Sequence, residues 1–553
     1  MFAPASRRRL SLNVPDERKF KRGDAFIDYI NALETETIEK MIPNEKRDVC
    51  ARVSRSVRNL LREKKLSITI TARDGSHVSN LIRQMDNFMT LFEIKGIEIN
   101  MNTDRYRRFF GANELESLGE KIVRCRKLTH LTLNKIRMRA EDVGRLALVL
   151  EQCASLAHLD LRWTWLYAEG IETLAPVLSR CSSLSSLDLG CNDIGNEGVE
   201  KLGAVLGQCK SVTHLNLSNN KIGARGAQAL LTCPSLVELN LYGNDIGPDG
   251  AAAFVPVLAQ FESLTSLNFG LCSLGPEGAR RLAEGLKKCK ALTYLNLSSN
   301  NMYNRGLCIL APALGQCASL AHLELQCNNF GDEGLISLAA GIGQCQALTH
   351  LDISKNRYKS EGLNSLGIKL AQCSFLAYLD VSVCESMCFN SVQRFAEGLG
   401  QCACLAHLDL SRCAIQNEAM GQLAAVLGRC TKLQYLNLCQ NHIQAEGMGM
   451  LADVLPQCKS LKALILRWNM IKNNGVQRLM SRLAQCTSLD HLDLYANSIE
   501  DEGALSMVQA LPECTSLAFV NFQGNEVSTA VVKALTACAA SLPHLTLLFT
   551  KYD

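Results

Sequence analysis

The sequence predicts an α/β fold: a solenoid, or horseshoe, of about 16 strand–helix coils with parallel strands on its concave face, plus a small helical N-terminal region. One apolar spacing indicates the strands: leucine, two residues, leucine, one residue, leucine, as in 184–189. It recurs almost always at 28-residue intervals, and the apolar residues between recurrences follow the helical period, as in Val199, Leu202 and Leu206. One such unit cannot bury its own apolar faces, so neighbouring units have to stack.

Each coil begins at an anchor, the first apolar residue of the spacing. The intervals between anchors are 28 residues except for one of 24, one of 29 and a final one of 25. The segment 94–99 fits the same spacing and is interpreted as a degenerate earlier coil. The sixteen anchors are Leu128, Leu156, Leu184, Val212, Leu236, Leu264, Leu292, Leu320, Leu348, Leu376, Leu405, Leu433, Leu461, Leu489, Leu517 and Leu542.

An asparagine follows three residues after the last strand leucine in ten of the first fifteen coils, and cysteine replaces it at Cys272, Cys384 and Cys413. A buried amide at this point can satisfy backbone groups of the turning loop, which would otherwise be unpaired. A thiol is a weaker substitute. Glycines then permit the turn, and an acidic residue such as Glu197 lies near the helix start, where the helix dipole favours it.

The whole pattern, L-x-x-L-x-L-x-x-N-x-I-G-x-E-G-x-x-x-L-A-x-x-L-x-x-C, resembles the leucine-rich repeats of the ribonuclease-inhibitor type, whose long units each contain a full helix. The resemblance extends from about Lys121 to Phe549. It implies the fold but does not identify a ligand, because this architecture serves many functions.

Cysteine stands three residues before the anchor in fourteen of the first fifteen coils, for example at Cys125, Cys153 and Cys289. We interpret these residues as small buried apolar groups, and a redox relay or a metal ladder is the alternative. The 25 cysteines, without an export signal at 1–10, indicate a reducing compartment, so the protein is expected to be cytoplasmic, with a nuclear location left open. By its resemblance to ribonuclease inhibitors, the chain is also expected to be sensitive to oxidation.

Eight of the ten histidines stand two residues after an anchor, on the strand face. The favoured interpretation is a half-exposed residue inherited by duplication. A neighbouring pair such as His322 and His350 that binds a metal or responds to pH is the alternative. No cofactor and no metal are predicted. The eight are His130, His158, His214, His322, His350, His407, His491 and His544.

Three domains are expected: a basic disordered tail at 1–23, a helical cap or F-box-like region with irregular first coils at 24–110, and the repeats at 111–553. Residues 24–65 have helical spacing in two halves joined at Pro43, and a strand is expected at 66–70. Leu33, Glu36, Ile38 and Met41, with the segment 49–54 and Arg58, are similar to an F-box. Glu34 and Val57 depart from the usual residues of that motif. The resemblance implies binding of a ubiquitin-ligase adaptor, and the alternative is a cap for the first coil.

A protein partner is expected on the concave face, where side chains project without affecting the core. Aromatic residues and arginine dominate protein–protein hot spots. The concave face has acidic residues as well as arginine, so no nucleic-acid-binding groove is predicted. No apolar run is long enough to span a membrane, so no membrane partner is predicted. The predicted partner-binding residues are Arg162, Trp163, Tyr242, Tyr294, Tyr378, Tyr435, Arg467, Trp468, Tyr495 and Phe519.

The predicted function is a non-catalytic interaction scaffold. No phosphate-binding loop, nucleophile elbow or H-E-x-x-H motif is present in the sequence, so the chain is not expected to be an enzyme. An F-box-like substrate receptor of a cullin ubiquitin ligase is the alternative. The Ran GTPase-activating family shares this repeat type, but its acidic tail is missing from 549–553. The apolar last coil, 542–549, is expected to be a capped or partnered edge.

Overall fold

A computed structural model of the chain describes residues 10–12, 66–72, 94–101, 112–207, 211–230, 233, 235–258, 263–384 and 389–549. These residues belong to two compact units, Met1–Asn216 and Leu217–Asp553, which are described separately. The helix pair expected at 24–65 and the F-box-like residues lie outside the described residues. No described helix has both the length and the apolar character needed to cross a bilayer.

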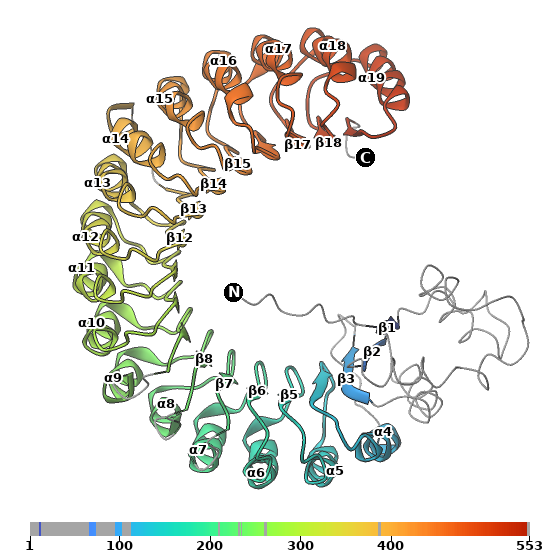
Figure 1. Ribbon diagram of the computed structural model, residues 1–553, viewed down its shortest axis with the longest axis vertical. Helices are drawn as coiled ribbons and strands as arrows, with labels where there is room; N and C mark the ends of the chain where they lie inside the picture. The colour runs from blue at the N-terminus through green and yellow to red at the C-terminus, as the bar shows by residue number, and fades with distance from the viewer. Residues whose placement is uncertain are drawn as a thin grey trace, which may run out of the picture. The chain divides into compact units, whose positions relative to one another are not determined.

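The first unit is a ladder of parallel strands backed by helices (Figure 1). The strands expected at 66–70 and 94–99 are confirmed as β2 and β3. A short strand, β1, pairs with β2 inside the segment expected to be disordered, because Leu10 and Leu12 alternate with a serine. The elements are β1 (Leu10–Leu12), β2 (Leu66–Ala72), β3 (Ile94–Met101), α4 (Ala112–Arg124), β4 (His130–Asn134), α5 (Ala140–Leu150), β5 (His158–Asp160), α6 (Tyr167–Leu178), β6 (Ser186–Asp188), α7 (Gly195–Leu206) and β7 (His214–Asn216).

The second unit continues the same strand–helix alternation. Its strands lie on the inner, concave side of a curve and its helices on the outer side (Figure 1). The elements are β8 (Glu238–Asn240), β9 (Ser266–Asn268), β10 (Tyr294–Asn296), β11 (His322–Glu324), β12 (His350–Asp352), β13 (Tyr378–Asp380), β14 (His407–Asp409), β15 (Tyr435–Asn437), β16 (Ala463–Ile465), β17 (His491–Asp493), β18 (Phe519–Asn521) and β19 (Thr546–Leu548), with helices α8 (Ala224–Ala229), α9 (Gly247–Leu258), α10 (Gly275–Leu286), α11 (Tyr303–Leu314), α12 (Asp332–Ile342), α13 (Ser360–Leu370), α14 (Phe389–Leu399), α15 (Asn417–Leu427), α16 (Ala445–Val454), α17 (Lys472–Leu483), α18 (Asp501–Ala510) and α19 (Thr529–Ser541), and the 3₁₀ turns η3 (Leu455–Gln457) and η4 (Leu511–Glu513).

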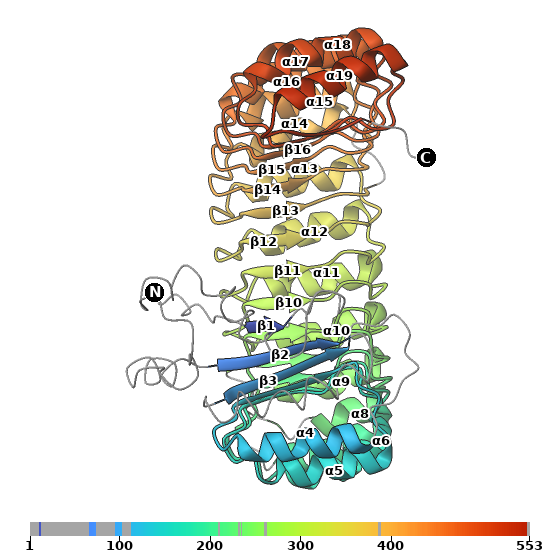
Figure 2. The ribbon, with the colours of Figure 1, turned by 90° about the vertical axis from the view of Figure 1, so that its right-hand side faces the viewer.

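Neighbouring strands pair in parallel with their equivalent residues side by side, so that His322 pairs with His350 and Glu324 with Asp352. The strands from β10 to β16 therefore form successive rungs (Figure 2). The predicted α/β solenoid of strand–helix coils is confirmed. Its core lies between the strands and the helices, where the repeated leucines such as Leu323 and Leu338 are fully buried.

The last coil differs from the sequence interpretation. In β19, Thr546 pairs with Phe519, which is two residues after its anchor. The residue equivalent to an anchor is therefore His544 and not Leu542, and His544 does not project from the strand face as expected. The apolar spacing misleads here because Leu542 and Leu545 are both buried just before the strand begins.

Where a coil has the asparagine, the amide bonds backbone groups of its own loop, as expected, and it also bonds the coil before it, which was not predicted. Asn328 is fully buried; its Nδ2 donates to Leu297 O at 2.8 Å and Leu325 O at 3.0 Å, and its Oδ1 accepts from the backbone N–H of Asn300 at 3.1 Å. At Cys272 the thiol lies 3.1 Å from Leu241 O, so it replaces one donor of the amide, but sulfur is a poorer acceptor.

The cysteines before the anchors are buried wherever the structure describes them, which supports the structural interpretation. Cys345 Sγ, for example, lies 3.3 Å from Leu314 O in the preceding coil. Burial raises the pKa of the Cys345 thiol to about 12, so the reactive thiolate is disfavoured there. Neighbouring helices also pack closely, because a Cβ on Gly398 in α14 would collide with the Gly367 carbonyl in α13.

Candidate functional site

The concave face of the second unit exposes three residues from each coil. Counting the anchor as position 1, the middle strand residue at position 4 is buried, while positions 3 and 5 are partly exposed in most strands, such as β11 and β12. Position 7 follows the strand, and position 8 lies in the loop beyond it. All ten predicted partner-binding residues fall into positions 3, 7 and 8. Strand alternation directs positions 3, 5 and 7 to the same side, and position 8 lies in the loop.

Six consecutive aromatic side chains at position 3 form a continuous stack, which we name the ring column. Neighbouring ring centroids lie 4.7, 3.7, 3.9, 4.3 and 4.2 Å apart along the series. The stack ends where position 3 is Ser266 on one side and Ala463 on the other. Because most of the rings lie face to face, they present their edges, rather than their faces, to the concave side. The column consists of Tyr294, His322, His350, Tyr378, His407 and Tyr435.

Position 5 places a row of acids beside the ring column, which we name the carboxylate row: Glu324, Asp352, Asp380 and Asp409. Each aspartate Oδ1 accepts the backbone N–H of the serine two residues later. The distances are 2.9 Å from Ser354, 2.8 Å from Ser382 and 2.8 Å from Ser411. These bonds fix the carboxylates in place on the strand.

The ends of the carboxylate row are paired within the chain. Glu324 Oε1 accepts from Tyr294 Oη at 3.0 Å and lies 3.0 Å from His322 Nε2. At the other end, Asp409 Oδ2 accepts from Asn437 Nδ2 at 2.8 Å. In the described part of the chain, Asp352, Asp380 and Asp409 form no ion pair, although the charge of Lys355 acts on Asp352.

Near pH 7 the carboxylate row is negatively charged, whereas most side chains of the ring column are uncharged. Burial, followed by the charge of Asp352 and Asp409, raises the pKa of Asp380 to about 6, and burial also raises the pKa of Asp352. Burial and the neighbouring His322 lower the pKa of His350 to about 4, so this imidazole is uncharged at neutral pH. The pKa of Glu324 shifts in the opposite direction to those of the aspartates. Burial raises it, but hydrogen bonds, chiefly from His322, outweigh burial, so the pKa is lowered overall.

The predicted Arg162–Trp163 pair lies in the first unit, after β5. The Arg162 guanidinium joins the carboxylates of two neighbouring coils: Nη2 is 2.6 Å from Asp160 Oδ2, and Nε is 3.2 Å from Asp188 Oδ2. Trp163 has a left-handed backbone with φ of 60° and is 37% exposed.

The equivalent pair in the second unit, Arg467–Trp468, is similar. Arg467 Nε lies 3.4 Å from Asp493 in the next coil, and its guanidinium lies 4.9 Å from the ring centroid of Tyr495. Trp468 has φ of 57°, is 57% exposed and lies 5.5 Å from Tyr495 between ring centroids. Arginine, tryptophan and tyrosine are thus gathered in one cluster, in which Trp468 is exposed and the other two are partly exposed.

The structure brings some predicted residues together and separates others. Tyr294, Tyr378 and Tyr435 belong to the ring column, and Phe519 stacks on His491 at 4.4 Å instead. Tyr242 lies apart, with its backbone N–H bonded to Asn240 Oδ1 at 3.0 Å.

Sequence reasoning missed the histidines of the column and the carboxylates beside them as parts of one site. The detectable signal was the unbroken run of aromatic residues at position 3 over six coils.

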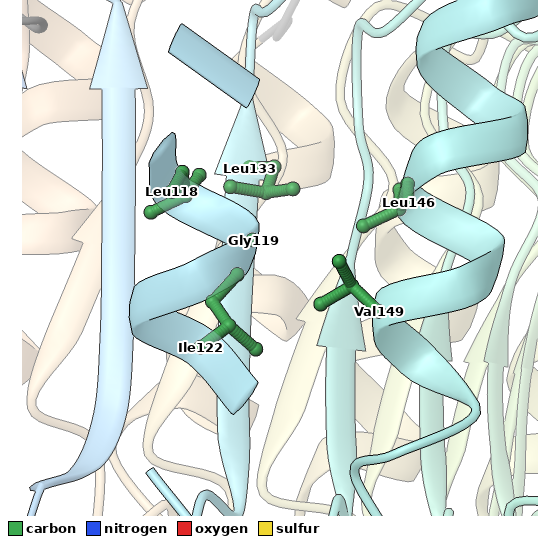
Figure 3. Close-up of a pocket in the computed structure, with 6 residues that line it drawn as sticks. All are labelled: Leu118, Gly119, Ile122, Leu133, Leu146 and Val149. Carbon is green, nitrogen blue, oxygen red and sulfur yellow. The ribbon is translucent and has the colours of Figure 1, made fainter. Parts of the chain in front are cut away.

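Neither a metal site nor a polar pocket is evident in the described residues. No group of three or more His, Cys, Asp or Glu side chains there is arranged to hold a metal ion. A small recess between α4 and α5 is lined by apolar side chains and a glycine, so it offers no chemistry (Figure 3). Its lining consists of Leu118, Gly119, Ile122, Leu133, Leu146 and Val149.

Comparison with known proteins agrees with this architecture. A family model described as Leucine Rich repeat matches residues 180–203, 208–231, 232–255, 262–283, 316–339, 401–424, 429–452, 457–480 and 485–508. With the strand–helix coils described above, these nine matches make the chain a leucine-rich repeat protein. No curated protein matches it.

Two solved structures are similar to the chain. An internalin (inlF) from Listeria monocytogenes str. 4b F2365 is 19% identical, covering 67% of this chain and 81% of that one, with a TM-score of 0.42. The plant peptide hormone receptor RGFR1, solved in complex with RGF2, is 16% identical, covering 89% of this chain and 87% of that one, with a TM-score of 0.37.

Proposed function

We propose that this leucine-rich repeat protein is a non-catalytic scaffold that binds a protein partner on its strand face. The observation that supports this most directly is the cluster of Arg467, Trp468 and Tyr495, because Trp468 is more than half exposed beside an arginine and a tyrosine. These three residue types are enriched in interface hot spots. The 28-residue unit with its own helix supports a repeat of the ribonuclease-inhibitor type. The many buried free thiols support a reducing, cytoplasmic location, because thiols stay reduced there.

The test compares three forms of the full chain as bait in a cell lysate: the parent, Trp163→Ala with Trp468→Ala, and Phe375→Ala with Leu148→Ala. The last pair removes exposed apolar side chains from outside the strand face, with 59% and 63% exposure. We expect the tryptophan variant alone to lose a partner that the parent retains. A partner that all three baits retain equally would contradict binding through the tryptophans.

The alternative proposal, an F-box-like substrate receptor, is supported by the sequence of 24–65 alone. Binding of a cullin-ligase adaptor to the full chain, abolished when residues 24–65 are deleted, is the expected result under that proposal. A GTPase-regulating role would be recognised by stimulated GTP hydrolysis.

A further inference from the structure

The chain contains its own example of how a cation fits its strand face. Arg162, at position 7, contacts the position-5 carboxylates of its own coil and of the next coil, at 2.6 and 3.2 Å. Arg467, also at position 7, reaches the position-5 carboxylate of the next coil, Asp493. Two neighbouring carboxylates on adjacent parallel strands, about 4.8 Å apart, therefore suit one guanidinium.

The carboxylate row repeats these acids without the arginine. Asp352, Asp380 and Asp409 occupy the same position 5 on three consecutive strands, but position 7 holds serine in each of these coils. No ion pair neutralises the three aspartates in the described part of the chain. The small serines leave the three carboxylates without a cationic partner and partly exposed, although Asp409 also accepts a hydrogen bond from Asn437.

We propose that Asp352, Asp380 and Asp409 bind arginine or lysine side chains from a basic linear segment of a partner protein. An arginine of that segment bridges two adjacent carboxylates, as Arg162 does within the chain. The neighbouring edges of the ring column contact the apolar part of the incoming side chain. Arginine is preferred over lysine, because its planar guanidinium donates to two carboxylates at once. This inference rests on the proposed function and specifies the chemistry of the partner.

The first experiment measures fluorescence anisotropy of labelled peptides with the full-length protein. One peptide has arginines separated by glycine and serine, and the matched peptide has the neutral isostere citrulline at the same places. We expect the arginine peptide to bind, and the citrulline peptide to bind ~10-fold more weakly or not at all. Raising the salt concentration should weaken the arginine peptide's binding.

The carboxylates are tested by Asp352→Asn with Asp380→Asn. Asparagine is compatible with this position, because Asn240 and Asn268 occupy it in other coils and accept the same backbone N–H at 3.0 Å. We expect arginine-peptide binding to fall ~10-fold or more. The matched control, Glu361→Gln with Glu418→Gln, removes two exposed charges from α13 and α15 and should leave binding unchanged.

A second variant keeps every carboxylate. Ser382→Arg places an arginine at position 7 between Asp380 and Asp409, equivalent to Arg162 between Asp160 and Asp188. It should block the arginine peptide while the protein stays folded, as monitored by its melting temperature. If Ser382→Arg does not fold, the asparagine variant alone decides the question.

Unchanged binding by the asparagine variant overturns the inference. Equal binding of the citrulline peptide, an equal loss in the glutamine control, or a free polyamine that competes as well as the peptide also overturns it. These outcomes are distinguishable from failure of the proposed function, since partner capture through Trp163 and Trp468 is measured separately.

Discussion

Asp380 is predicted to lower the stability of the protein at neutral pH, so Asp380→Asn should stabilise it. The pKa of this carboxyl rises from 3.8 to about 6 on folding. At ~1.4 kcal/mol per pH unit, ionising it in the folded protein costs about 3 kcal/mol at pH 7.5, as an upper bound. Asparagine removes the charge and can keep the 2.8 Å bond from the Ser382 N–H.

The sign of the effect depends on pH. A carboxyl whose pKa is raised by folding destabilises the protein above its folded pKa, here about 6, and this penalty disappears as the pH falls to the unfolded value of 3.8. Asp380→Asn should therefore gain stability at pH 7.5 and match the parent near pH 3.5.

The gain should be measured by hydrogen exchange of the backbone amides in β13 and β14, together with urea unfolding. Local exchange is preferred, because a long repeat array does not unfold in a single two-state step. Asp160→Asn is the control: it removes the partner of Arg162 and should destabilise its own coil. A loss of protection in Asp380→Asn at pH 7.5, or a gain that is the same at both pH values, would refute the reasoning.

Three further predictions can be tested. Binding of the arginine peptide should weaken between pH 7.5 and 5.5, because Asp380 gains a proton. Protonating a nearby histidine acts in the same direction, and anisotropy that does not change with pH would contradict the prediction. The titratable groups around Asp380 are Asp352, Asp409, Tyr378, Tyr435, His350 and His407. Asn328→Ala should lower the free energy of unfolding by about 3 kcal/mol or more, and with it the melting temperature, because four buried hydrogen bonds are lost. The control Gln346→Ala removes an exposed amide and should change the melting temperature little. In the native protein, iodoacetamide should label the partly exposed Cys404 well before the buried Cys345, as read by mass spectrometry; equal rates would show that Cys345 is accessible.

Much of the fold could be predicted because the apolar spacing and the buried asparagine are local and repeated. The anchor leucines, the amide bonds of Asn328 and the buried corner cysteines all follow from one coil's chemistry, copied along the chain. The last coil was misaligned because Leu542 satisfies the spacing without starting a strand. A pattern of burial does not distinguish a strand residue from the turn before it.

The site was only partly predictable for a different physical reason. Position 3 was identified as exposed, and three tyrosines of the ring column were predicted to bind a partner. Stacking, however, depends on the register between coils, which brings His322 and His350 to a centroid distance of 3.7 Å. Which carboxylates stay unpaired depends on side-chain reach. Only the structure shows that Arg162 joins Asp160 and Asp188, while no arginine among the described residues does the same for Asp380.

The asparagine ladder has a mechanical consequence for the second unit. At Cys272 and Cys413 a thiol replaces the amide and lies 3.1 and 3.4 Å from a backbone carbonyl oxygen of the preceding coil, which is a weaker bond than the amide makes. Under tension applied to the ends of this unit, these two links should extend before the amide-bonded ones. The link at Cys413 lies in the coil of Asp409, so we expect the spacing of the coils to change more readily beside the carboxylate row than between amide-bonded coils.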